Sequence, residues 1–95
     1  AASVIVVSIP DWGAMPFAEG RDPAAIGREI DAFNAINREE AARAGARYVD
    51  VTALSREART KPTWVARDGL HPSGEMYRAW VKALLAEAQG ALKAG

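Results

Sequence analysis

The chain has 95 residues, of which 49% are hydrophobic and 25% charged, a size and balance typical of one globular domain. Twelve basic and twelve acidic residues cancel and are scattered, so we expect no nucleic-acid partner, which would need clustered Lys and Arg. No apolar run approaches the roughly 20 residues of a membrane span, and the absence of cysteine excludes disulfides and thiolate chemistry. The cellular compartment is left open.

The first predicted strand is Val4–Ile9, a β-branched apolar run typical of a strand buried on both faces of a parallel sheet. A loop over 10–21 follows. A long helix is predicted next, because Asp22 can cap it, Pro23 fits its first turn and Gly45 can stop it. Its apolar stripe at helical spacing is Ile26, Ile30, Phe33 and Ala41.

A second buried strand is predicted over 46–52. The order strand, helix, strand indicates a right-handed βαβ unit, with Val4–Ile9 and Arg47–Val51 adjacent and parallel. A short helix over Ala53–Arg59 and an irregular segment over 60–72 should follow, before Ser73 caps a last helix. The apolar face of that helix comprises Met76, Tyr77, Trp80, Val81, Leu84, Leu85 and Ala88, and we expect Trp80, Leu84 and Leu85 to lie in the core.

A sheet of only two strands is small, because apolar strands of this kind normally belong to a larger sheet that helices cover on both faces. At least one strand edge would be unpaired, and an open apolar edge promotes association. The chain also starts almost directly on the first strand without an initiator methionine, as an interior cut or a processed chain would. We therefore expect residues 1–95 to be half of one doubly wound α/β domain.

The only histidine, His71, lies three residues after Asp68 in the segment DGLHPS, just before the last helix. A carboxylate this close can accept a hydrogen bond from one imidazole nitrogen and so fix the tautomer and orientation of the ring. The other nitrogen can then take a proton from a serine hydroxyl and return it to a leaving group. A purely structural hydrogen bond within the loop is the alternative interpretation.

The segment DGLHPS resembles the last motif of the SGNH (GDSL-type) hydrolases. VSIPDWGAMPFA resembles the fourth strand and following loop of an esterase or lysophospholipase-like branch, and EIDAFNAINREEAARAGARYVDVT resembles the helix and fifth strand that come next. The resemblance covers the whole chain in order. It implies a flavodoxin-like α/β/α sandwich of which this chain is the carboxyl-terminal half.

By this resemblance, His71 is the general base and Asp68 the orienting acid of a Ser-His-Asp triad that cleaves a small ester without a cofactor. The chain contains no Gly-Asp-Ser nucleophile motif and no Gly or Gly-x-Asn-Asp motif for an oxyanion hole. The resemblance therefore implies that the amino-terminal half of the domain supplies these groups as a partner. We expect the chain alone to be inactive.

Several alternatives stay open at this point. Asp11 and Trp12, with Met15 and Phe17, can line a substrate pocket beside the histidine or can cap the sheet. A metal role for His71 is disfavoured because the chain offers no second histidine. The competing functional class is a non-catalytic interaction module that binds through its exposed strand edge.

Overall fold

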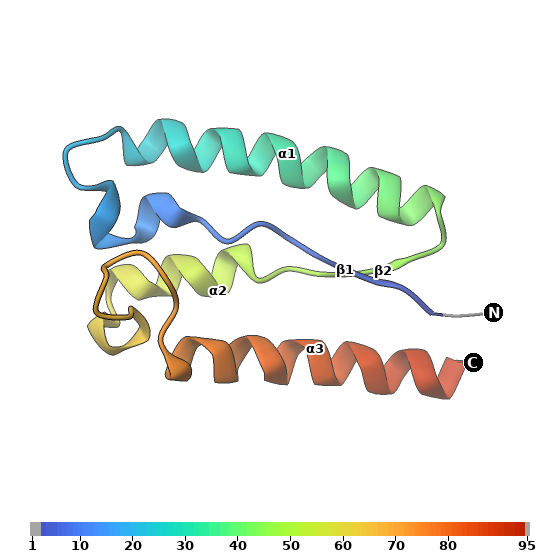
Figure 1. Ribbon diagram of the computed structural model, residues 1–95. Coiled ribbons are helices and arrows are strands. Elements are labelled where there is room, and N and C mark those ends of the chain that lie inside the picture. The colour runs from blue at the N-terminus through green and yellow to red at the C-terminus, as the bar shows by residue number, and fades with distance from the viewer. Residues whose placement is uncertain (1–2, 95) are drawn as a thin grey trace.

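The computed structural model describes residues 3–94. Two long helices, α1 (Pro23–Arg43) and α3 (Gly74–Ala94), lie on opposite sides of two short strands, β1 (Ile5–Val7) and β2 (Arg47–Val49) (Figure 1). The short helix α2 (Thr52–Arg56) follows β2 directly. The layers are therefore helix, sheet and helix, which confirms the predicted α/β class.

The strands β1 and β2 are parallel, with Ile5 opposite Arg47 and Val7 opposite Val49, and α1 connects them. The predicted βαβ unit is thus confirmed, although both strands are shorter than the sequence indicated. The backbone N–H of Ser8 still donates to the carbonyl of Val49 at 2.9 Å, but that of Ile9 donates to Asn34 Oδ1 on α1. The N–H of Ile9 faces away from β2 in this register. The N–H of Val51, which would continue the ladder, donates to the side-chain Oγ of Ser8 at 2.8 Å, and the ladder ends there.

The boundaries of α1 follow from local chemistry. Asp22 Oδ1 accepts the backbone N–H of Ala25 at 3.0 Å, and Pro23 occupies the first turn, where its missing N–H costs no hydrogen bond. At the other end Gly45 has a φ of +74°, and the N–H of Ala46 donates to the carbonyl of Ala41 at 2.9 Å. Gly45 in the left-handed conformation thus ends the helix, as the sequence predicts.

The second half of the chain packs around Met76, which is fully buried on α3. Its buried neighbours are Met15 from the first loop and Ala58 from the 3-10 turn η3 (Glu57–Arg59), and Trp80 and Trp64 pack against them. Met15 is therefore a core residue. The segment after α2 contains one more 3-10 turn, η4 (Pro62–Trp64), and is otherwise irregular, as predicted.

Two apolar stripes are less buried than predicted. Phe33 on α1 is 64% exposed and Leu85 on α3 is 54% exposed, so the expectation of a core position for Leu85 is wrong. Each helix has 21 residues, whereas each strand has three, so the helices extend past the surface that the strands can cover. No helix in residues 3–94 combines the length and apolarity that crossing a bilayer requires.

The loops gather at one end of the molecule. Both strands point their carboxyl ends the same way, and residues 10–22 and 57–73 come together beyond those ends (Figure 1). Ligand sites of open α/β sheets form at this edge.

Candidate active site

The segment 66–72 forms a tight turn held by its own backbone. The N–H of Ala66 donates to the carbonyl of His71 at 2.8 Å, and the N–H of Gly69 donates to the carbonyl of Ala66 at 3.0 Å. Gly69 has a φ of +73°, a conformation that glycine adopts without strain. The turn therefore brings Asp68 and His71 onto one short loop just before α3.

Within this loop Asp68 contacts His71 through both carboxylate oxygens. Oδ1 accepts the backbone N–H groups of Leu70 and His71, each at 2.9 Å, and Oδ2 contacts the imidazole Nδ1. The hydrogen bond with the His71 side chain, with the two backbone bonds, lowers the pKa of Asp68 to about 2. Asp68 is therefore a carboxylate at neutral pH, and its contact with Nδ1 of His71 orients the imidazole ring.

The imidazole of His71 is open to solvent, with 67% of its side chain exposed. Its Nδ1 faces Asp68, so Nε2 is the nitrogen left to exchange a proton with another group. A general base needs a free outer nitrogen, and an orienting acid contacts the inner nitrogen. The ring of His71 has both features.

The first loop is attached directly to the histidine loop. The N–H of Phe17, in the 3-10 turn η2 (Pro16–Ala18), donates to the carbonyl of Gly69 at 2.9 Å. A hollow of about 440 Å³ lies between the two loops. Its lining residues are Pro10, Trp12, Phe17, Leu70, His71 and Pro72.

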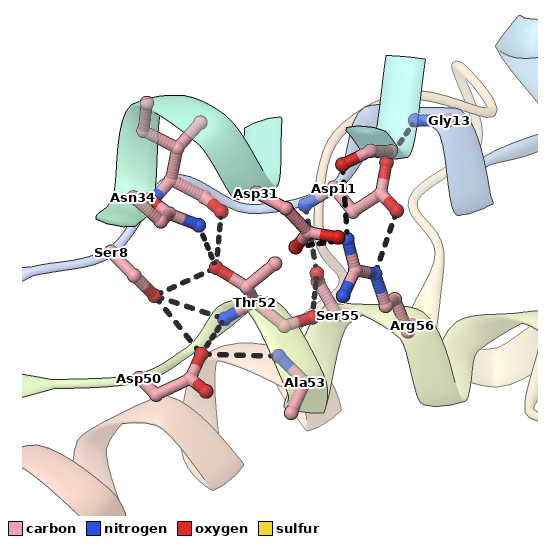
Figure 2. A network of polar contacts seen from close by, with 12 residues as sticks. Ser8, Asp11, Gly13, Asp31, Asn34, Asp50, Thr52, Ala53, Ser55 and Arg56 are labelled. Atoms are coloured by element: carbon pink, nitrogen blue, oxygen red, sulfur yellow. Dashed lines mark hydrogen bonds and ion pairs between the residues drawn. The ribbon is translucent and has the colours of Figure 1, made fainter. Parts of the chain in front are cut away.

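Trp12, predicted as a candidate pocket residue, thus lies in the same hollow as His71, whereas Asp11 does not line it. The carboxylate of Asp11 is fully buried beneath the first loop. Its Oδ1 accepts the N–H of Gly13 at 2.9 Å, and its Oδ2 pairs with Arg56 Nε at 2.8 Å (Figure 2). These contacts give Asp11 a structural position, in which it anchors the loop that carries Trp12.

Arg56 joins this loop to α1 and α2. Its guanidinium also pairs with Asp31 at 2.8 Å, and the two carboxylates, Asp11 first, raise the pKa of Arg56 above its ordinary value (Figure 2). Sequence reasoning did not identify this residue, because it lies 45 positions from Asp11 and belongs to no motif. Leu70 was also missed, although it lies inside the DGLHPS segment.

The hydroxyl groups of the serines near the strand ends are engaged in buried hydrogen bonds. Ser8 and Ser55 are buried, and their hydroxyl groups bond to the backbone: Ser8 Oγ accepts the N–H of Val51 at 2.8 Å, and Ser55 Oγ donates to the carbonyl of Thr52 at 2.6 Å (Figure 2). Neither can serve as a solvent-accessible nucleophile. Across residues 3–94 no three His, Asp or Glu side chains come close enough together to hold a metal ion.

Over most of its length the chain matches a known protein family. The model of the GDSL-like Lipase/Acylhydrolase family matches residues 1–79, which include both loops and the Asp68–His71 turn. No curated protein and no solved structure matches the chain significantly. Because the family match covers most of the sequence and the α/β fold is consistent with it, the chain belongs to the GDSL-like Lipase/Acylhydrolase family of hydrolases.

Proposed function

We propose that this chain provides the general base and the orienting acid of a serine hydrolase that cleaves ester bonds. His71 is the base, Asp68 orients it, and the serine and oxyanion hole lie on the amino-terminal half of the same domain. The contact between Asp68 Oδ2 and His71 Nδ1 is the observation that carries the proposal. Membership in a family of lipases and acylhydrolases supports the choice of ester substrates.

In the proposed reaction, Nε2 of His71 takes the proton of the serine hydroxyl as its oxygen forms a bond to the ester carbonyl carbon. The same nitrogen then gives this proton to the oxygen of the leaving alcohol as the bond between that oxygen and the carbonyl carbon breaks. Water repeats the sequence on the acyl-serine and releases the acid. Asp68 stays ionised throughout, because its pKa is about 2, and stabilises the imidazolium that forms in between.

Three observations support a second segment as the source of the nucleophile. The sequence has no Gly-Asp-Ser motif, and both Ser8 and Ser55 are buried in hydrogen bonds. The apolar surface beside β1 is also open: Val4 is 56% exposed and Val81 on α3 is 58% exposed. A neighbouring strand and its covering helix would bury such a surface.

Reconstitution tests the proposal. The 95-residue chain is mixed with a purified amino-terminal half of a domain of this family that carries the Gly-Asp-Ser motif, and hydrolysis of short-chain esters is measured. We expect a one-to-one complex with esterase activity, and no activity above a His71→Ala control for the chain alone. In the complex, we expect kcat to fall by about 10⁶-fold for His71→Ala and about 10⁴-fold for Asp68→Asn, the ranking found in serine proteases.

The contrary outcomes are distinct. A chain that hydrolyses esters alone in a His71-dependent manner would show that the nucleophile lies within these 95 residues. A complex whose activity is unchanged by His71→Ala would remove the proposed base. A stable monomer that binds no amino-terminal half would favour the non-catalytic interaction module.

A further inference from the structure

We infer that the hollow beside His71 receives the alcohol portion of the ester, and that Trp12 and Phe17 determine which alcohols are accepted. The inference rests on the proposed function and adds to it the identity of the group bound on this side of the reacting carbon. It assigns the hollow to a neutral alkyl or aryl alcohol.

The walls of the hollow are mostly apolar. Among its lining residues, His71 alone carries an ionisable side chain. The hydrogen bond from the Phe17 N–H to the Gly69 carbonyl joins the first loop to the histidine loop. The ring centroids of Trp12 and Phe17, which form the aromatic wall of the hollow, lie 6.3 Å apart. A surface built in this way favours the burial of hydrocarbon.

The chemistry decides which half of the ester lies here. In the proposed reaction the leaving oxygen must come within hydrogen-bond reach of His71, because the imidazole returns the proton to it. The carbonyl oxygen must instead face oxyanion donors, which the proposed function places outside this chain. The alcohol is therefore the part of the substrate that lies next to His71.

The charged side chains nearest to the lining residues have opposite signs. Asp68, ionised because its pKa is about 2, lies next to His71 and repels anionic groups. The guanidinium of Arg21 lies 4.8 Å from the Phe17 ring centroid and 6.0 Å from that of Trp12, and it repels cationic groups. Neither sign of charge is favoured by both groups, so the apolar lining of the hollow decides for an alkyl or aryl alcohol.

Two isomeric esters test the assignment in the reconstituted, His71-dependent enzyme. Pentyl acetate and methyl hexanoate contain the same atoms and differ in which side of the ester carries the five-carbon chain. We expect Phe17→Ala to lower kcat/KM for pentyl acetate by roughly fivefold or more and to leave methyl hexanoate nearly unchanged, because a few methylene contacts are lost on the alcohol side alone. Phe33→Ala is the matched control, since Phe33 is an exposed aromatic on α1, and it should change neither rate.

A second measurement does not depend on catalysis. The 95-residue chain is titrated with pentan-1-ol while the His71 ring resonances are followed by NMR. We expect binding that Phe17→Ala and Trp12→Leu weaken and Phe33→Ala does not, with the amide spectrum of each variant reporting that it is folded.

The outcomes separate the inference from the proposed function. His71-dependent hydrolysis in which Phe17→Ala slows methyl hexanoate as much as pentyl acetate overturns the inference and leaves the function standing. Pentan-1-ol that fails to bind at the hollow also overturns it. If neither ester is hydrolysed in a His71-dependent manner, the proposed function fails, and the assignment of a leaving alcohol fails with it.

Discussion

Replacement of Asp11 by alanine should destabilise the fold, because its carboxylate is fully buried and has two kinds of partner. Oδ1 caps the 3-10 turn η1 (Trp12–Ala14) by accepting the N–H of Gly13, and Oδ2 pairs with Arg56 Nε. The alanine variant loses the cap and leaves one side of the guanidinium without its carboxylate (Figure 2).

The magnitude follows from these two losses. A lost side-chain cap costs about 1 kcal/mol. Breaking a fully buried ion pair costs about 3–5 kcal/mol, but the Arg56 side chain is 31% exposed and keeps Asp31, so about 1–2 kcal/mol is the appropriate range here. The free energy of unfolding should therefore fall by about 2–3 kcal/mol, which for a domain of this size lowers Tm by roughly 10–20 °C.

Urea and thermal unfolding followed by circular dichroism measure this change. Asp31→Ala is the matched control, because Asp31 pairs with the same guanidinium at the same 2.8 Å but is 61% exposed. An exposed pair contributes little, so we expect a loss of less than about 0.5 kcal/mol for this variant. Equal losses for the two variants would refute the argument from burial. Unchanged stability combined with weaker substrate binding would instead support Asp11 as a pocket residue.

Three further predictions concern the same two loops and the strand ends. Gly13→Ala should lower the free energy of unfolding in urea by about 1–3 kcal/mol, because the new Cβ would lie 2.9 Å from Asp11 Oδ1 and 3.0 Å from a backbone carbonyl oxygen. In the control Gly74→Ala the new Cβ meets no atom within 4 Å, so stability should be nearly unchanged, and equal effects of the two variants would contradict the packing argument. Ser8→Ala should cost about 1–3 kcal/mol, because the buried N–H of Val51 loses its acceptor, whereas that of Thr52 keeps Asp50 Oδ1; a loss below about 0.5 kcal/mol would mean that water replaces the hydroxyl. For Asp68 the folded-state pKa lies below its ordinary value, so its stabilising contribution is complete above about pH 4 and is lost as the pH falls toward 2. Asp68→Asn should remove that part of the pH dependence of Tm, and an unaltered acid limb would show that Asp68 is not its source.

Features that depend on neighbouring residues were predictable from the sequence. The cap at Asp22, the proline that follows it and the stop at Gly45 set the ends of α1, because each acts within one helical turn. The βαβ unit followed from the order of its elements, since a parallel crossover has one favoured hand. The three-residue spacing of Asp68 and His71 likewise predicted their contact, because one short turn holds both side chains.

Contacts between distant residues were not predictable in this way. The position of Asp11 depends on Arg56, 45 residues later, and the place of Phe17 beside His71 depends on one hydrogen bond to Gly69. The exposure of Leu85 was also missed, because periodicity shows that a helix has an apolar face but does not show how much surface lies opposite to cover it.

The sequence by itself therefore determined the class of the fold, the resemblance to the family and the contact between Asp68 and His71. Only the tertiary structure decided that Trp12 lines the same hollow as His71 while Asp11, its neighbour in the chain, is buried as a structural ion pair. The physical reason is that the role of a carboxylate or an aromatic ring depends on its burial and partners. Those are set by segments that meet only when the chain folds.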